Sequence, residues 1–392
     1  MKLPSTLQHQ FFAHAEREAE RCKERLAARS LRLQELKKEI PLERIPEDDS
    51  WRSWRVAVID GSNSPSTSER LGIRYGAFCA GYMIFEGEKR VEENYFSDSF
   101  SQDQTSSQDV AQKVLAMMRF RMERDIALQC LKEKDVDLIL IDGSFFGFRA
   151  DAYFIKGEVI DVMGFERGSN LTAEVTAKTL ELLKSRKVVG VIKRTRVSAL
   201  DGWVVWRYGD ESRCVNSNDK HILASIMRPR DWFAYDFIFG SPVDFNYFSR
   251  MKAVYRYLVL QAKKKATPED LLLAAKRDVR NHIKKSLGYA ADAILRTARY
   301  YARCSNQAPF EFETPLNFEV KPLLAYFQTF HNPATGLPWP IDLIDEGASL
   351  PRGFTKEFVQ EIEAELIRDP SIADKLALAE YFSYLNPQKE ED

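Results

Sequence analysis

The sequence has few of the residues that mark several common protein classes. Its five cysteines include no Cys-x-x-Cys pair, which argues against a disulfide framework or a cysteine zinc site and is typical of the reducing cytoplasm. Its five histidines form no His-Glu-x-x-His motif, which argues against a zinc protease. The net charge of -1 gives no overall basic field, so any contact with DNA must come from local patches.

The sequence also lacks long apolar runs and glycine-rich nucleotide loops. No apolar segment is long enough to span a bilayer, and the amino terminus lacks the apolar core of a signal peptide. There is no Gly-Gly pair and no Gly-x-x-x-x-Gly-Lys-Ser/Thr loop. With 392 residues, 44% hydrophobic and 29% charged, the chain is globular and long enough for two or three domains.

Two apolar stretches of the sequence end in the same three residues. Residues 55–62 and 138–144 are each an apolar run followed by Asp-Gly-Ser, a pattern typical of a central strand. Asp60 and Asp142 end these runs, although aspartate is unfavourable in a strand or a core unless it is paired or coordinated. One such residue alone fits a turn or a helix cap. Two copies predict carboxylates that meet at one sheet edge, where they hold a divalent cation.

Glu123 is the third candidate carboxylate, within the helix predicted at residues 109–133. Helical spacing places Glu123 in a stripe of apolar residues, so it should face the sheet. A carboxylate there needs a cation or a hydrogen-bond donor. The alternative role for Glu123 is an ion pair with Arg119, four residues earlier.

A cluster of basic residues follows the apolar run at residues 188–193. Lys193 ends this run, as the two aspartates end theirs, and Arg194 and Arg196 come next. A cation beside carboxylates holds a phosphate or stabilises developing charge. Lys193 is therefore a candidate catalytic residue, and all three are candidate DNA-binding residues. The alternative is a solvated strand end.

Asp342 and Asp345 lie three residues apart, just after Pro338 and Pro340. If a helix starts there, both fall in its first turn and on roughly one face, although the macrodipole favours acidic residues there in any case. With the other carboxylates they form the set that phosphodiester hydrolysis needs. Two hard cations, about 3.5–4 Å apart, activate water and steady the leaving oxygen.

The order of predicted elements indicates an α/β sheet rather than a helix bundle. Strands are expected at residues 54–60, 73–85, 90–96, 136–142 and 188–193, with helices at 109–133 and 171–187 and a loop at 97–108. Later segments are expected to be mostly helical at 250–297, a hairpin at 299–304 and 310–314, and helical at 319–331 and 354–385. Residues 5–40 predict a long amphipathic helix, either packed on its own domain or serving as an arm for a partner.

The motifs, taken in order, resemble those of the NurA nuclease family. The matching segments are Val58–Ser62, Glu123, Leu140–Ser144, Val191–Lys193 and Gly336–Asp345, within roughly residues 50–350. The resemblance implies an RNase H-like mixed sheet flanked by helices, a homodimer, and a Mn²⁺- or Mg²⁺-dependent 5′-to-3′ DNA nuclease. It also implies a partner, the hexameric ATPase HerA, and a role in end resection during double-strand break repair.

The resemblance also assigns site residues. Asp60, Glu123 and Asp142 match the metal-binding carboxylates of the family, and Lys193 matches its strand-end lysine. The last motif departs from the archaeal pattern, which has an Ala-His pair where this chain has Ile344-Asp345. Asp345 would then replace the histidine as the fourth metal ligand, so that the site becomes more purely carboxylate.

By this resemblance the chain divides into three parts. They are a helical arm at residues 1–48, an RNase H-like nuclease domain at 49–350 with a helical insertion at about 250–297, and a carboxyl-terminal helix and tail at 351–392.

Three alternatives to this interpretation stay open. An actin-like ATPase or sugar kinase also places Asp-Gly loops after strands, but usually needs the Gly-Gly loop that this chain lacks. A catalytically silent scaffold would bind only DNA or a partner ATPase, and the intact carboxylates weigh against it. A NurA-like protein could equally serve phage defence instead of repair.

Overall fold

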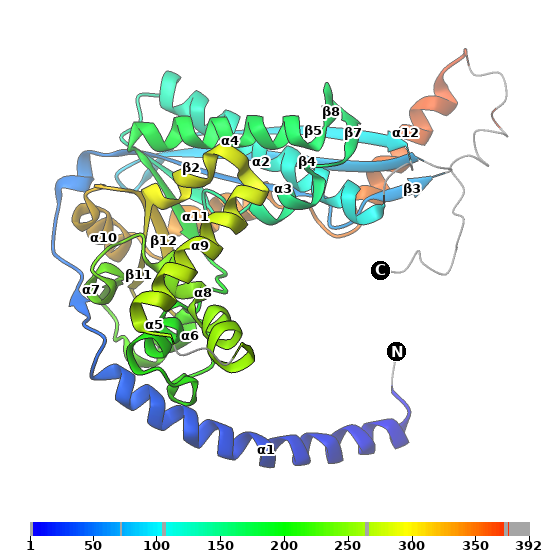
Figure 1. Ribbon diagram of the computed structural model, residues 1–392. Coiled ribbons are helices and arrows are strands. Elements are labelled where there is room, and N and C mark those ends of the chain that lie inside the picture. Colours follow the sequence, from blue (N-terminus) through cyan, green and yellow to red (C-terminus); the bar gives the residue numbers. More distant parts are fainter. Residues whose placement is uncertain (1–2, 71–72, 104–106, 263–265, 372–374, 376–392) are drawn as a thin grey trace.

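A mixed β-sheet forms the centre of the molecule (Figure 1). The computed structural model describes residues 3–70, 73–103, 107–262, 266–371 and 375. In these residues the sheet has ten strands in the order β1-β10-β11-β12-β9-β6-β2-β4-β3, with β5 paired to β4. Its central strands are β2 (Arg55–Asn63), β4 (Ile73–Glu86), β5 (Lys89–Asp103), β6 (Leu138–Asp142) and β9 (Val188–Ile192). β2, β4 and β5 pair antiparallel, whereas β2, β6 and β9 run parallel.

An antiparallel extension continues the sheet beyond β9. It comprises β12 (Phe310–Pro315), β11 (Thr297–Arg303), β10 (Asp231–Ala234) and the short β1 (Glu43–Arg44). β11 and β12 confirm the predicted hairpin. β3 (Ser68–Arg70) pairs with β4, and a separate hairpin is made by β7 (Val159–Val162) and β8 (Phe165–Arg167).

Helices cover both faces of the sheet and bury a separate core on each (Figure 1). One core lies beneath α2 (Gln108–Glu133), α3 (Arg149–Ile155) and α4 (Gly168–Ser185), and extends to α5 (Ala199–Tyr208), α6 (Asp219–Ile226), α8 (Phe245–Tyr255) and α9 (Pro268–Leu287). The other lies beneath α10 (Val320–Thr329) and α11 (Trp339–Ala348). Together with the amino-terminal helix α1 (Ser5–Lys37), α7 (Asp236–Phe239) and α12 (Phe354–Arg368) complete the α-helices of the described residues. The predicted mixed α/β sheet flanked by helices is confirmed.

Two predicted boundaries are wrong. Residues 97–103 belong to β5 instead of a loop, because their backbone pairs with residues 73–79 of β4 although most of their side chains are polar and exposed. The helix predicted over residues 354–385 is interrupted after Arg368, two residues before Pro370, because a proline disfavours helical backbone in the residue before it. Residues 372–374 and 376–385 of that prediction lie outside the described residues. The basic run at residues 263–265 and the tail at 389–392 lie outside the described residues.

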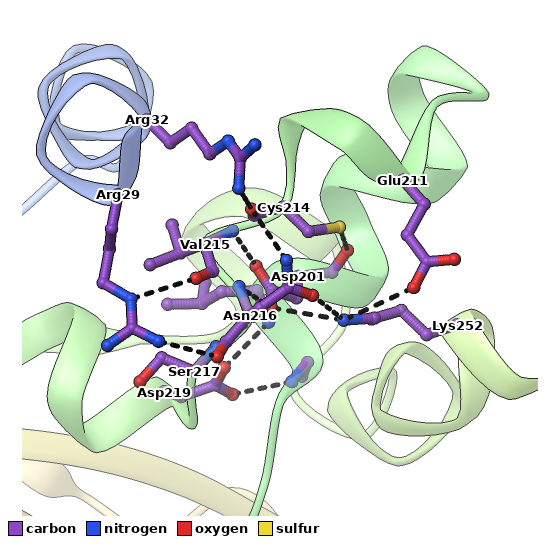
Figure 2. A network of polar contacts seen from close by, with 12 residues as sticks. Arg29, Arg32, Asp201, Glu211, Cys214, Val215, Asn216, Ser217, Asp219 and Lys252 are labelled. Atoms are coloured by element: carbon purple, nitrogen blue, oxygen red, sulfur yellow. Dashed lines mark hydrogen bonds and ion pairs between the residues drawn. The ribbon is translucent and has the colours of Figure 1, made fainter. Parts of the chain in front are cut away.

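The amino-terminal helix α1 (Ser5–Lys37) projects from the rest of the molecule as a long arm (Figure 1). Its carboxyl-terminal half is anchored by two arginines that donate to carbonyl groups of the 214–216 loop (Figure 2). Arg29 donates to Val215 O at 3.3 Å, and Arg32 donates to Cys214 O at 2.9 Å. The amino-terminal half exposes apolar residues, among them Phe11 and Phe12. Across the described residues, every helix is too short or too polar to serve as a membrane span.

Candidate active site

Strand periodicity directs three polar side chains to the same face of the sheet. Val58 on β2, Leu140 on β6 and Val191 on β9 all belong to the core beneath α10 and α11. Asp60, Asp142 and Lys193 each follow one of these residues by two positions, and side chains two apart share a face of a strand. Because β2, β6 and β9 are parallel neighbours, the three side chains meet at one carboxyl edge.

Helix α11 adds a third carboxylate to this edge. Oxygen atoms of Asp60, Asp142 and Asp345 all lie within 4.8 Å of one another. The Nζ atom of Lys193 is 2.7 Å from Asp142 Oδ2 and 2.7 Å from Asp345 Oδ2. Three hard oxygen donors at this separation fit a divalent cation such as Mg²⁺ or Mn²⁺. The residues present therefore suit the metal that the sequence predicts.

The electrostatics of Asp60 set it apart from an ordinary buried acid. Burial, followed by the neighbouring carboxylates of Asp142 and Glu123, raises its pKa to about 9. The opposing influences are the Gly61 N–H, which donates to Asp60 Oδ1 at 2.7 Å, and Lys193. Burial also raises the pKa of Asp142, although Lys193 opposes this shift. These carboxylates thus favour protons unless a cation replaces the protons.

Glu123 approaches from the opposite face of the sheet, on α2. It is fully buried, as its place in an apolar stripe predicts. Its carboxylate pairs with Arg119 and with Arg124, whose Nη1 is 3.3 Å from Oε2, and burial raises its pKa. Glu123 is not part of the three-carboxylate group. The ion pair with Arg119, which was the alternative predicted for Glu123, is therefore present. Glu123 nevertheless lies close enough to the site for its charge to raise the pKa of Asp60.

The glycine of each Asp-Gly-Ser motif has a geometric reason. A Cβ atom on Gly61 would lie 2.9 Å from Glu123 Oε1 and 2.8 Å from the carbonyl oxygen of Cys79. Gly143 has a φ of +106°, a conformation that other residues rarely adopt. Its N–H donates to Val191 O at 2.7 Å. The glycines thus bring Glu123 close to β2 and turn the chain sharply after Asp142.

The loop after Asp142 is held by buried charged residues that the sequence analysis missed. Glu313 Oε2 accepts from Ser144 Oγ at 2.7 Å and from the Phe145 N–H at 3.1 Å. Arg299 Nη2 donates to Ser144 Oγ at 2.9 Å, and Arg124 Nη2 donates to Phe145 O at 3.2 Å. Glutamates at alternate positions in the aromatic strand Phe310–Pro315 are the one sequence signal for this support.

The two acidic residues of α11 have different surroundings. α11 begins at Trp339, so Asp342 lies in its first turn and Asp345 one turn later. Asp342 accepts from Asn332 Nδ2 at 2.8 Å and from the Thr335 hydroxyl, which holds the preceding turn. The expectation that both lie in the first turn is wrong, and only Asp345 reaches the other carboxylates.

The three predicted basic residues also differ in their surroundings. Lys193 lies between two carboxylates, and Lys220 Nζ donates to its carbonyl oxygen at 2.7 Å. Arg194 and Arg196 are exposed, and neither makes an ion pair within the part of the chain that the structure describes. They are therefore accessible to a ligand but lie outside the carboxylate cluster.

Comparisons with known proteins identify the family. The NurA domain matches residues 55–350, which is most of the chain. The chain belongs to the NurA family. Its enzyme class is accordingly that of a metal-dependent nuclease. No curated protein sequence matches the chain significantly.

A solved structure supports the same fold. The NurA nuclease from Sulfolobus solfataricus is similar with a TM-score of 0.58 and 11% identity, over 94% of this chain and 98% of that one. A NurA structure with manganese has a TM-score of 0.49 and 11% identity, over 91% and 98% of the two chains. With the strand order β5-β4-β2-β6-β9, the predicted RNase H-like fold is confirmed.

Proposed function

We propose that this NurA-family protein cleaves DNA phosphodiester bonds at the edge where Asp60, Asp142 and Asp345 converge. The observation that carries the proposal is the approach of three carboxylates within 4.8 Å beside Lys193. Bound Mn²⁺ or Mg²⁺, as a pair in the two-metal form, supplies Lewis acidity and lowers the pKa of water. Resemblance to the family adds 5′-to-3′ exonuclease activity, together with endonuclease activity, to this proposal.

The side chains at the site have distinct roles in this proposal. Asp60 and Asp142, fixed at adjacent strand ends, are the rigid ligands, and Asp345 completes the set from α11. Lys193 neutralises Asp142 and Asp345 and could contact a phosphate oxygen of the substrate. Glu123, which pairs with Arg119 and Arg124, would serve as a further ligand of the cation.

A nuclease assay with an ATPase assay beside it tests this proposal against its alternatives. Labelled DNA should be cut in Mn²⁺ or Mg²⁺, and chelation should abolish cutting, because the carboxylates lose the cation that neutralises them. Full cleavage in excess EDTA would contradict a metal-dependent mechanism. ATP hydrolysis without any DNA cleavage would support the actin-like alternative instead.

We also propose that the protein acts as a homodimer with a HerA-type hexameric ATPase in DNA end resection and double-strand break repair. The support is the family resemblance together with α1, whose amino-terminal half exposes Phe11 and Phe12. Arg29 and Arg32 anchor the other half, so deletion of residues 1–25 leaves the anchor intact. That deletion should weaken dimer or ATPase binding in sizing and pull-down experiments while cleavage persists. Unchanged assembly would contradict this role for the arm.

A further inference from the structure

Helix α9 presents an unusual concentration of positive charge at the surface. From residue 276 onward it carries five basic residues and a single acidic one, Asp278. Arg277, Arg280, Lys284 and Lys285 are exposed. The spacings of three and four place the first three in one stripe, and Lys285 flanks this stripe on the exposed side of the helix. The opposite face of α9 is buried against α8, α5 and α3 (Figure 1). The basic face, defined by these four residues, is therefore directed to solvent.

Among the residues that the structure describes, no acidic side chain pairs with this basic face. Asp278 is engaged elsewhere, with its Oδ2 atom 2.8 Å from Arg250 Nε. Within the described ranges, none of the four cations of the basic face forms an ion pair. Lys132, an exposed cation of α2, has by contrast an acidic partner on α4, with its Nζ atom 2.9 Å from Glu181. In a chain with a net charge of -1, uncompensated cations in a row favour a polyanion as the ligand.

Buried and half-buried cations connect α9 with the loop that follows Asp142. Arg299 Nη2 lies 2.9 Å from Ser144 Oγ in that loop. Arg149, at the start of α3, has a pKa lowered by burial and by the nearby charges of Arg299 and Arg250. Burial lowers the pKa of His282 on α9, and the charges of Arg149 and Arg250 lower it further. These arginines form a series of neighbours from the loop beside the carboxylates to α9, in which Arg299 pairs with Glu311 and Glu313, and Arg250 pairs with Asp278.

We propose that the basic face of α9 binds the phosphate backbone of the nucleic acid that is cut at the carboxylate site. The inference rests on the proposed nuclease function and adds a contact surface outside the site. Lysine and arginine contacts to phosphates position a strand without reading its sequence. The basic face should therefore contribute to affinity for DNA of any sequence, and it should not contribute to the chemical step.

The test replaces the four cations of the basic face with glutamine, which retains helix propensity. A matched control replaces four exposed cations near the amino ends of the central strands, on the opposite edge from the carboxylates: Lys89, Lys132, Lys184 and Arg186. Cleavage rates are measured against DNA concentration at several salt concentrations and saturating Mn²⁺. Equal melting temperatures establish that both variants are folded.

The basic-face variant should have a KM for DNA raised at least about tenfold at moderate salt, with kcat unchanged. Its slope of log affinity against log salt should flatten by about 3, because each lost phosphate contact removes about 0.7–0.9. The control should match the wild type. An equal effect in the control, or a wild-type KM and slope in the basic-face variant, would overturn the inference even if cleavage is intact. A wild-type protein that cuts no DNA would instead refute the proposed function, and anisotropy with labelled DNA would still test the basic face.

Discussion

Two groups of buried aspartates in this protein differ in what surrounds their oxygen atoms. Asp201 accepts hydrogen bonds from the N–H groups of Val215 at 2.7 Å and Asn216 at 2.8 Å, and Lys252 lies 3.6 Å away (Figure 2). Burial raises the pKa of Asp201, and these neighbours lower it. Burial also raises the pKa of Asp60, but its neighbouring carboxylates raise it further.

The difference separates a structural acid from a ligand. Asp201 has its charge satisfied by donors that the fold supplies, so it fixes the loop to which α1 is anchored. Asp60 receives one backbone hydrogen bond and faces two other carboxylates. A buried carboxylate with too few donors is unfavourable without a cation. Burial alone therefore does not distinguish a functional acid from a structural one. The charge of the neighbouring groups does.

The largest effect should come from neutralising one aspartate of each kind, a predicted metal ligand and a structural acid. Asp142→Asn should lower kcat at least about a hundredfold, because it removes a ligand from the site where charge develops. Asp201→Asn should instead lower the free energy of unfolding by about 1–3 kcal/mol, because buried donors lose an ionised acceptor. Cleavage per folded molecule and urea denaturation measure both effects. Normal cleavage by the Asp142 variant would assign that residue to a turn.

The two acids of α11 provide a second contrast within one helix. Asp345→Asn should raise the Mn²⁺ concentration for half-maximal cleavage at least about tenfold. Asp342→Asn should change it little, because Asp342 serves the turn at Asn332 and Thr335. Asp345→His should keep partial activity, since a neutral imidazole is also a metal ligand. A metal titration of cleavage by all three variants measures these effects. A larger Mn²⁺ requirement in Asp342→Asn than in Asp345→Asn would show that Asp342, and not Asp345, is the ligand from α11.

The pKa of Asp60 predicts a pH-dependent change in stability. With a folded pKa of about 9 against an ordinary 3.8, the unfolded chain releases this proton first as pH rises. The metal-free protein should therefore lose stability between about pH 4 and pH 9. Asp60→Asn removes the loss and should be more stable than the wild type at pH 8 by about 1 kcal/mol or more, but not at pH 4. Urea denaturation in EDTA measures this, and equal stability at pH 8 would argue against the electrostatic account.

The smallest effect should come from the support behind the loop. Glu313→Gln keeps the shape of the side chain but weakens the charge-assisted bonds to Ser144 and Phe145. We expect a fall in kcat of about tenfold or less together with a raised metal requirement. Glu319→Gln, at an exposed position, is the control. A lower melting temperature without any change in metal requirement would limit Glu313 to a structural role.

Much of this site could be predicted from sequence, because β-strand alternation is local. The spacing Val58–Asp60 and Leu140–Asp142 already places both aspartates on one face of adjacent strands. Glu313 could not be assigned, because its partner Ser144 is 169 residues away in sequence and meets it only in the folded sheet. The strand at residues 97–103 was missed for a similar reason, since its pairing with β4 decides its structure more than its composition does.

Direct measurement of Mn²⁺ binding tests the central claim, that Asp60, Asp142 and Asp345 form a cation site whereas Asp201 does not. Calorimetry at pH 7.5, in two buffers of different ionisation enthalpy, reports both affinity and proton release. The account predicts that the wild type and Asp201→Asn bind Mn²⁺ alike and release protons. It predicts that Asp60→Asn and Asp142→Asn lose at least about tenfold in affinity. Wild-type binding by the last two variants would contradict it.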